Sequence, residues 1–130
     1  MSKNQKIKME FRTRKLIKPE DLNAGGSSFG GQLLKWIDEE SAIYAMCQLN
    51  NRRVTTKFIS EIDFISPARL GDVVEIGIET IQLGVTSITF KCEARVKGSE
   101  KVIIKIEKIV FVNLNEKGIP SPHNKEKLLV

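Results

Sequence analysis

Apolar residues recur at helical spacing between Gly30 and Asn50, which predicts one long helix. At ~100° per residue they fill roughly half of the helix circumference, and the set comprises Leu33, Leu34, Ile37, Ala42, Ala45 and Leu49. Asp38 falls inside this arc, at about 140° from Leu33. A carboxylate buried without a partner is costly. Asp38 therefore breaks the pattern and is the first candidate for a functional residue.

Alternation of apolar and polar residues predicts strands on both sides of this helix. One short strand is expected before it, over residues 7–12, and four follow it, over residues 54–64, 74–80, 88–96 and 102–112. Glycines mark the turns between the last four strands. In the last strand the apolar residues change parity near Lys108, which predicts a β-bulge or burial on both faces.

The order of these elements predicts an α+β fold, because tight turns between successive strands favour antiparallel pairing. We expect a long antiparallel sheet of about five strands wrapped around one central helix. The length suits a single domain, 1–130, with flexible ends at about 1–5 and 121–130. Such a sheet leaves edge strands that can pair between subunits, so we expect a homo-oligomer.

The composition argues against several classes of protein. No apolar run approaches ~18 residues, so we expect no membrane span. The charged N-terminus has no apolar segment behind it, which favours a cytoplasmic location. Cys47 and Cys92 form no Cys-x-x-Cys motif and His123 is isolated. We therefore expect two buried free thiols and no metal site.

The net charge of +5 is concentrated at the two ends of the chain, while the middle is acidic. A basic surface can attract nucleic acid. The basic runs, however, lack interleaved aromatic residues, and no zinc-finger or helix-turn-helix spacing occurs. A small molecule rich in phosphate is an equal interpretation, and simple solubility is a third. We expect no nucleic-acid partner.

Four glycines lie within residues 23–31, where the predicted helix begins. The stretch is not a P-loop, because no Lys-Ser or Lys-Thr follows, and it lacks the dinucleotide spacing after a long strand. Unpaired N–H groups at a helix start can bind a phosphate or the oxyanion formed when a carbonyl is attacked. The alternative is a glycine turn that only lets helix and sheet pack closely.

Two side chains complete this candidate site, and each has a structural alternative. Asn23 is either a turn residue or a catalytic amide. Asp38 is either a base or a carboxylate satisfied by Ser41, Thr56 or Arg53. An amide, an anion-binding helix start and a carboxylate are together the parts needed to hydrolyse an acyl compound with water.

The same residues carry a resemblance that covers about residues 9–120. The sequence resembles the hotdog-fold acyl-CoA thioesterases of the bacterial YciA and brain acyl-CoA hydrolase type in the motifs Asn23-Ala24-x-Gly-x-x-Phe29-Gly30-Gly31, Asp38-Glu39, Val54-Thr55, Phe64-x-x-Pro67-x-x-x-Gly71-Asp72 and Gly84-x-Thr86-Ser87. The resemblance implies a hotdog fold and hydrolysis of acyl-CoA to free acid and CoA. It also implies a dimer as the minimal active unit, assembled into a hexamer as a trimer of dimers. No metal and no cofactor are implied, since coenzyme A is part of substrate and product.

The resemblance assigns roles to individual residues as well. Asn23 and Asp38 match the family's catalytic asparagine and aspartate, and the backbone of Gly30 and Gly31 matches its carbonyl-binding helix start. Phe29 and Thr56 are expected beside the substrate. Basic side chains are expected against the CoA phosphates, namely Arg53, Lys57, Arg95 and Lys97.

Our mechanistic hypothesis is that Asp38 takes a proton from the water that attacks the thioester. The helix start stabilises the oxyanion and Asn23 orients the water. Direct attack by Asp38, giving an anhydride, is the alternative. Gly31 and Asp38 lie about 10 Å apart along one helix at ~1.5 Å per residue. We therefore expect a two-fold dimer to join Asn23 and Gly31 of one subunit to Asp38 of the other.

Two other functions stay open for a protein of this fold. One is a hotdog hydratase or dehydratase, although such sites resemble a His paired with a carboxylate and the one histidine here lies in the tail. The other is a non-catalytic protein that binds or senses acyl-CoA, which would need an attached output domain.

Overall fold

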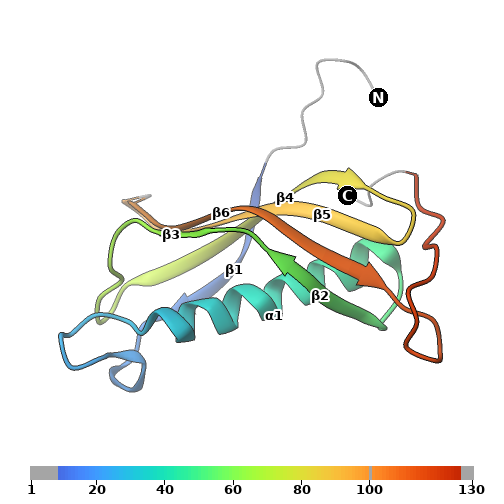
Figure 1. Ribbon diagram of the computed structural model, residues 1–130. Coiled ribbons are helices and arrows are strands. Elements are labelled where there is room, and N and C mark those ends of the chain that lie inside the picture. The colour runs from blue at the N-terminus through green and yellow to red at the C-terminus, as the bar shows by residue number, and fades with distance from the viewer. Residues whose placement is uncertain (1–8, 100, 127–130) are drawn as a thin grey trace, which may run out of the picture.

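The computed structural model describes residues 9–99 and 101–126. One long helix, α1 (Gly30–Leu49), lies against a curved sheet (Figure 1). Before it come β1 (Glu10–Leu16) and a short 3-10 turn (Pro19–Asp21). After it come five strands, namely β2 (Val54–Ile59), β3 (Ile62–Phe64), β4 (Val73–Leu83), β5 (Ser87–Val96) and β6 (Lys101–Asn113). This arrangement confirms the predicted α+β hotdog fold.

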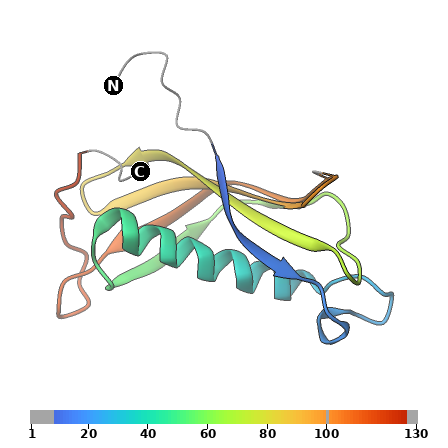
Figure 2. The same cartoon turned by 180° about the vertical axis from the view of Figure 1, so that it is seen from behind.

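The sheet is antiparallel and has the strand order β1-β4-β5-β6-β2, with β3 also paired to β6. In Figure 1 β2 passes in front of α1, and in the reverse view of Figure 2 β1 does so. The two edge strands therefore flank the helix on opposite sides. The middle of the sheet is a meander, because β4, β5 and β6 are neighbours both in sequence and in space.

The strand count is six rather than five because the predicted strand over 54–64 is interrupted at Ser60 and Glu61. The interruption lies opposite the parity change near Lys108. Phe90 pairs with Ile109 and Cys92 with Ile106, so β6 carries one extra residue there, which confirms the predicted bulge. Ser60 fills the irregularity, since its N–H donates to the Lys108 carbonyl (2.9 Å) and its Oγ accepts from the Lys108 N–H (3.1 Å).

The first strand differs from the expected one. It runs to Leu16 rather than turning after Arg12, and Ile7 and Lys8 lie outside the described residues. An irregularity in register between Phe11 and Thr13 lets β1 continue along β4 to Val73. Pairing with β4 thus overrides the weak apolar pattern of a strand rich in charge.

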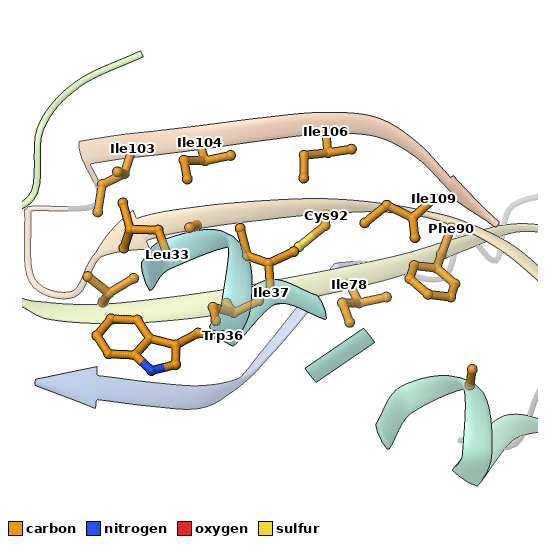
Figure 3. Packing of buried hydrophobic residues seen from close by; sticks show 14 of the residues in the cluster. Leu33, Trp36, Ile37, Ile78, Phe90, Cys92, Ile103, Ile104, Ile106 and Ile109 are labelled. Atoms are coloured by element: carbon orange, nitrogen blue, oxygen red, sulfur yellow. The ribbon is translucent and has the colours of Figure 1, made fainter. Parts of the chain in front are cut away.

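The core lies between α1 and the concave face of the sheet. Figure 3 shows Leu33, Trp36 and Ile37 pointing from the helix toward the sheet. The strands supply a layer of buried side chains opposite them, including Ile78, Phe90, Cys92, Ile103, Ile104, Ile106 and Ile109. Removal of this apolar area from water is the main favourable term that holds helix and sheet together.

The buried face of α1 differs from the predicted arc at two residues, because Trp36 is buried and Asp38 is exposed. Cys47, which lies outside that arc, is exposed. The expectation that Asp38 lies inside the buried arc is therefore wrong for this chain, because the sheet approaches Asp38 only through its edge strand β2. The expectation of two buried thiols is right for Cys92 alone.

The segment after β6 is more ordered than the loose end expected from residue 121. The Ser121 N–H donates to the Asn113 carbonyl (2.9 Å) and the His123 N–H to the Val85 carbonyl (3.1 Å). His123 is buried, with Nε2 3.0 Å from the Ser87 carbonyl. Residues 1–5 and 127–130 lie outside the described residues. Within residues 9–99 and 101–126, no helix is long and apolar enough to cross a membrane.

Candidate active site

The loop before α1 is closed on itself by hydrogen bonds. The Phe29 N–H donates to the Asp21 carbonyl (3.0 Å), which joins the two ends of the loop. Inside it, Asn23 Oδ1 accepts from the backbone N–H groups of Gly25 (2.9 Å) and Ser27 (3.2 Å). The Ser28 N–H donates to the Ala68 carbonyl (2.8 Å), which anchors the loop to the segment after β3.

These bonds fix which way the Asn23 amide faces. Two donors already occupy its Oδ1, so the amide can interact with a further molecule only through the N–H groups of Nδ2. Within the described residues, Nδ2 has no acceptor. Asn23 is thus both a turn residue and a presented hydrogen-bond donor, so the two sequence-based interpretations are compatible.

The start of α1 is uncapped and partly open. Phe29 is the N-cap residue, is half exposed, and no side chain of the described residues caps this end. A Cβ built on Gly31 would meet nothing within 4 Å, whereas one on Gly30 would lie 3.0 Å from Cε1 of Phe64. The first-turn N–H groups carry a partial positive charge and can bind an oxyanion. Gly31 presents the open side of this end, and Gly30 allows the Phe64 ring to lie close.

Asp38 has a defined partner on the neighbouring edge strand. Thr56 Oγ1 donates to Asp38 Oδ1 at 2.9 Å. Of the other two expected partners, Ser41 has a buried Oγ without a hydrogen bond and Arg53 lies 3.8 Å from Glu116. One carboxylate oxygen is thus held in place while the carboxylate stays exposed, which suits a group that must meet a substrate or a water.

The described chain forms two half-sites instead of one complete site. The first contains Asn23 and the helix start at Gly30 and Gly31. The second contains Asp38 and Thr56, more than one helical turn further along α1. Because α1 is continuous between them, Asp38 and Gly31 of one chain stay apart.

The four basic residues expected to meet CoA do not gather in one place. Arg53 and Lys57 are exposed near β2, and Lys97 is exposed just after β5. Arg95 is engaged inside the chain, with Nε 3.0 Å from Glu75 Oε1 and its guanidinium 3.6 Å from the centroid of the Phe11 ring. Ala94 and Val96 beside it are core residues, so Arg95 lies on the opposite face of the sheet from α1.

The described residues contain no metal-binding group, and their one buried thiol, Cys92, is unsuited to catalysis. Across residues 9–99 and 101–126, no three His, Cys, Asp or Glu side chains form a group able to hold a metal ion. Burial raises the pKa of the Cys92 thiol to about 12, which makes it a poor nucleophile at neutral pH.

The interpretation of the sequence assigned no role to Asp21, which lies in the 3-10 turn before the loop. Asp21 is buried, and its carboxylate accepts from the Lys18 N–H (2.9 Å) and from Nε2 of Gln32 (2.9 Å). Gln32 lies in the first turn of α1, where Glu or Gln often reaches back to the preceding loop. The position of Gln32 in the first helical turn was therefore the signal in the sequence from which this contact could have been predicted.

Comparison with known proteins identifies the family of the chain. A family model described as the Thioesterase superfamily matches residues 25–103. The chain belongs to this superfamily, and the resemblance to the YciA type is confirmed.

The chain is 37% identical over 124 residues to an uncharacterized acyl-CoA thioester hydrolase of Buchnera aphidicola subsp. Baizongia pistaciae, with 91% of each chain covered. It is 32% identical over 119 residues to the acyl-CoA thioester hydrolase YciA of Salmonella typhimurium, covering 87% of this chain and 89% of that one. The hexameric thioesterase y2039 from Yersinia pestis superposes with a TM-score of 0.79 at 31% identity, covering 87% and 93%.

Proposed function

We propose that the protein is an acyl-CoA thioester hydrolase that releases a free acid and CoA. The observation that carries this proposal is the similarity over nine-tenths of the chain to a relative named for that activity. The geometry agrees with it, because an exposed carboxylate held by a hydroxyl and an uncapped helix start are groups suited to hydrolysis of an acyl compound.

In the proposed mechanism, Asp38 accepts a proton from the water that attacks the thioester carbonyl. Thr56 holds Oδ1 of Asp38, which leaves Oδ2 to face the water. The first-turn N–H groups at Gly30 and Gly31 stabilise the oxyanion, and Phe29 lies beside the same end. Nδ2 of Asn23 donates either to the carbonyl oxygen or to the oxygen of the water. Direct attack by Asp38, giving an anhydride, is the competing route.

We propose further that the complete site forms between two subunits. Each chain holds Asn23 and Gly31 at one end of α1 and Asp38 further along it, so a two-fold dimer can join complementary halves. Edge strand β2 lies beside Asp38 and exposes Phe58 and Ile59. The Yersinia pestis relative is hexameric, and assembly of three such dimers into a hexamer completes the quaternary structure that we propose.

The phosphates of CoA would then be met by basic side chains near β2 and β5. Arg53, Lys57 and Lys97 are exposed and able to contact an anion. Arg95 is already paired with Glu75, and we expect it to contribute less.

The test of the activity is release of free thiol from a ladder of acyl-CoA substrates of increasing chain length. We expect turnover that depends on chain length. Stoichiometric binding of acyl-CoA without thiol release would instead favour the sensing protein, and reversible hydration of an enoyl-CoA would favour the hydratase.

The test of the shared site is complementation. Co-expression of Asn23→Ala and Asp38→Ala chains gives mixed dimers in which one site is doubly damaged and the other is intact. Random pairing yields about half mixed dimers with one good site of two, so about a quarter of wild-type activity should return. A mixture as inactive as its parents, with mixed dimers confirmed by mass, would place the site within one subunit.

A further inference from the structure

The buried contact between Asp21 and Gln32 is not explained by the proposed chemistry itself. Asp21 is 3% exposed, and a buried carboxylate is tolerated only when hydrogen bonds compensate its lost hydration. Its Oδ2 accepts from the Lys18 N–H and its Oδ1 from Nε2 of Gln32, both at 2.9 Å. Gln32 is the third residue of α1, so this bond ties the segment before the loop to the first turn of the helix.

The backbone of Asp21 makes a second tie to the same place. Its carbonyl accepts from the N–H of Phe29, the residue directly before α1 (3.0 Å). The loop over residues 22–28 thus begins and ends at Asp21. Asn23 lies two residues after Asp21, and Gly30 and Gly31 lie directly before Gln32. The Asp21–Gln32 contact therefore sets the position of Asn23 relative to the helix start.

We propose that Asp21 and Gln32 are positioning residues for the thioester carbonyl. They hold Nδ2 of Asn23 and the N–H groups of Gly30 and Gly31 in one fixed relation. This inference rests on the proposed function and assigns the contact a role in turnover as well as in folding. Displacement of catalytic donors by about 1 Å can reduce the rate up to ~10²-fold, so a side-chain contact in a neighbouring turn can matter.

A polarity swap tests the proposal. In Gln32→Glu, two carboxylates face each other, and we expect kcat to fall about tenfold or more. In the double variant Asp21→Asn/Gln32→Glu, Oδ1 of the new amide accepts from the Lys18 N–H and its Nδ2 donates to the new carboxylate. We expect this double variant to recover to within about threefold of wild type. Asp21→Asn alone should also stay near wild type, because the Gln32 amide can turn to present its oxygen.

Two measurements distinguish positioning from general support of the fold. The inhibition constant of an alkyl-CoA thioether, which has no carbonyl, should stay within about twofold of wild type in every variant. Oligomer mass should also be unchanged, whereas the melting temperature of Gln32→Glu should fall, because the buried Asp21 carboxylate loses its donor, and should recover in the double variant. Gln32→Leu, which removes the bond without adding charge, serves if Gln32→Glu does not fold, and it should also lower kcat.

The proposal is overturned if Gln32→Glu and Gln32→Leu keep wild-type kcat. It is equally overturned if the double variant is no better than Gln32→Glu, or if thioether binding weakens in parallel with kcat. Amide hydrogen exchange over residues 23–31 can be measured without any activity. The exchange rate should rise in Gln32→Glu and fall back to the wild-type rate in the double variant. A wild-type protein without thioesterase activity would thus refute the proposed function, while exchange would still decide whether the contact orders this loop.

Discussion

The two edges of the sheet have opposite characters. In β1 four of the seven residues are charged, namely Glu10, Arg12, Arg14 and Lys15. In β2 the one charged residue is Lys57, and Phe58 and Ile59 are exposed at the end of the strand. Charged edges resist pairing with other strands, whereas an apolar edge invites it. One edge is therefore suited to solvent and the other to a partner subunit.

The helix reflects the same difference at two adjacent residues. Asp38 is bonded to Thr56 of β2 at 2.9 Å, while Glu39 lies 3.9 Å from Nζ of Lys15 in β1. Both are exposed acids on one helix, yet one faces the apolar edge and the other the charged edge. A carboxylate on this helix thus gains its candidate role from the edge that it faces, since the apolar β2 edge is the one better suited to pairing with a second subunit.

The largest difference in kcat between the two sides of the helix is expected when the Asp38 and Glu39 carboxylates are replaced in separate variants. Asp38→Asn keeps the shape but removes the base, and kcat should fall by at least ~10². Glu39→Gln removes only an exposed ion pair, and kcat should stay close to wild type. Steady-state kinetics of both variants checks this prediction, and equal melting temperatures show that both variants are folded. Near-normal turnover in Asp38→Asn would remove Asp38 from the mechanism.

The next largest effect is expected on assembly of the oligomer. Each edge strand has an apolar residue of similar exposure that can be replaced to test it. Phe58 of β2 is 49% exposed and Leu16 of β1 is 54% exposed. Phe58→Lys should reduce the oligomer mass measured by light scattering and lower activity more than about tenfold, because a charged edge resists pairing and the proposed site is shared. Leu16→Lys should retain the wild-type oligomer mass and activity. An unchanged mass in Phe58→Lys would exclude this end of β2 from the interface.

A smaller effect is expected from the hydroxyl that holds Asp38. Thr56→Val removes the donor while keeping the shape, and kcat should fall about tenfold because the carboxylate loses its orientation. Thr55→Val changes the neighbouring exposed residue on the other face of the same strand and should have little effect. Equal kcat values for the two variants would show that Thr56 does not orient Asp38.

The smallest effect is expected from ionic strength. KM for acyl-CoA should rise severalfold with added salt, because screening shortens the Debye length to about 10 Å at 0.1 M. An acyl-pantetheine, which lacks the nucleotide phosphates, should show no such rise. Lys57→Ala should weaken the salt response more than Arg95→Ala, since Arg95 is already paired with Glu75. Identical salt responses of the two substrates would argue against a phosphate-binding patch.

Features set by local periodicity were predictable from the sequence. The helix ends at Leu49, and Asn50 then adopts a left-handed conformation with φ of 50°. The parity change near Lys108 became a bulge. Thr56 was one of three partners expected for Asp38, and it is the one observed. These features depend on neighbours within a few residues or on a short set of chemical alternatives.

Features set by distant partners were not predictable. The interruption at Ser60 depends on its bonds to Lys108 in another strand. The exposure of Asp38 depends on where the sheet ends, which a helical wheel cannot show. Asp21 was missed because its carboxylate bonds to Gln32 across a loop whose closure the sequence pattern does not reveal.

The pairing of β2 with the last strand has a consequence for how the chain acquires its site during synthesis. Thr56 pairs with Phe111 of β6, so the strand that holds Asp38 is fixed only by a segment made much later. Contacts between distant parts of a chain form slowly, because a long loop must close first. The helix, its carboxylate and Thr56 thus leave the ribosome well before β6, the strand with which β2 pairs. Ordering of the edge that holds Asp38 is therefore a late step of folding, which waits for β6.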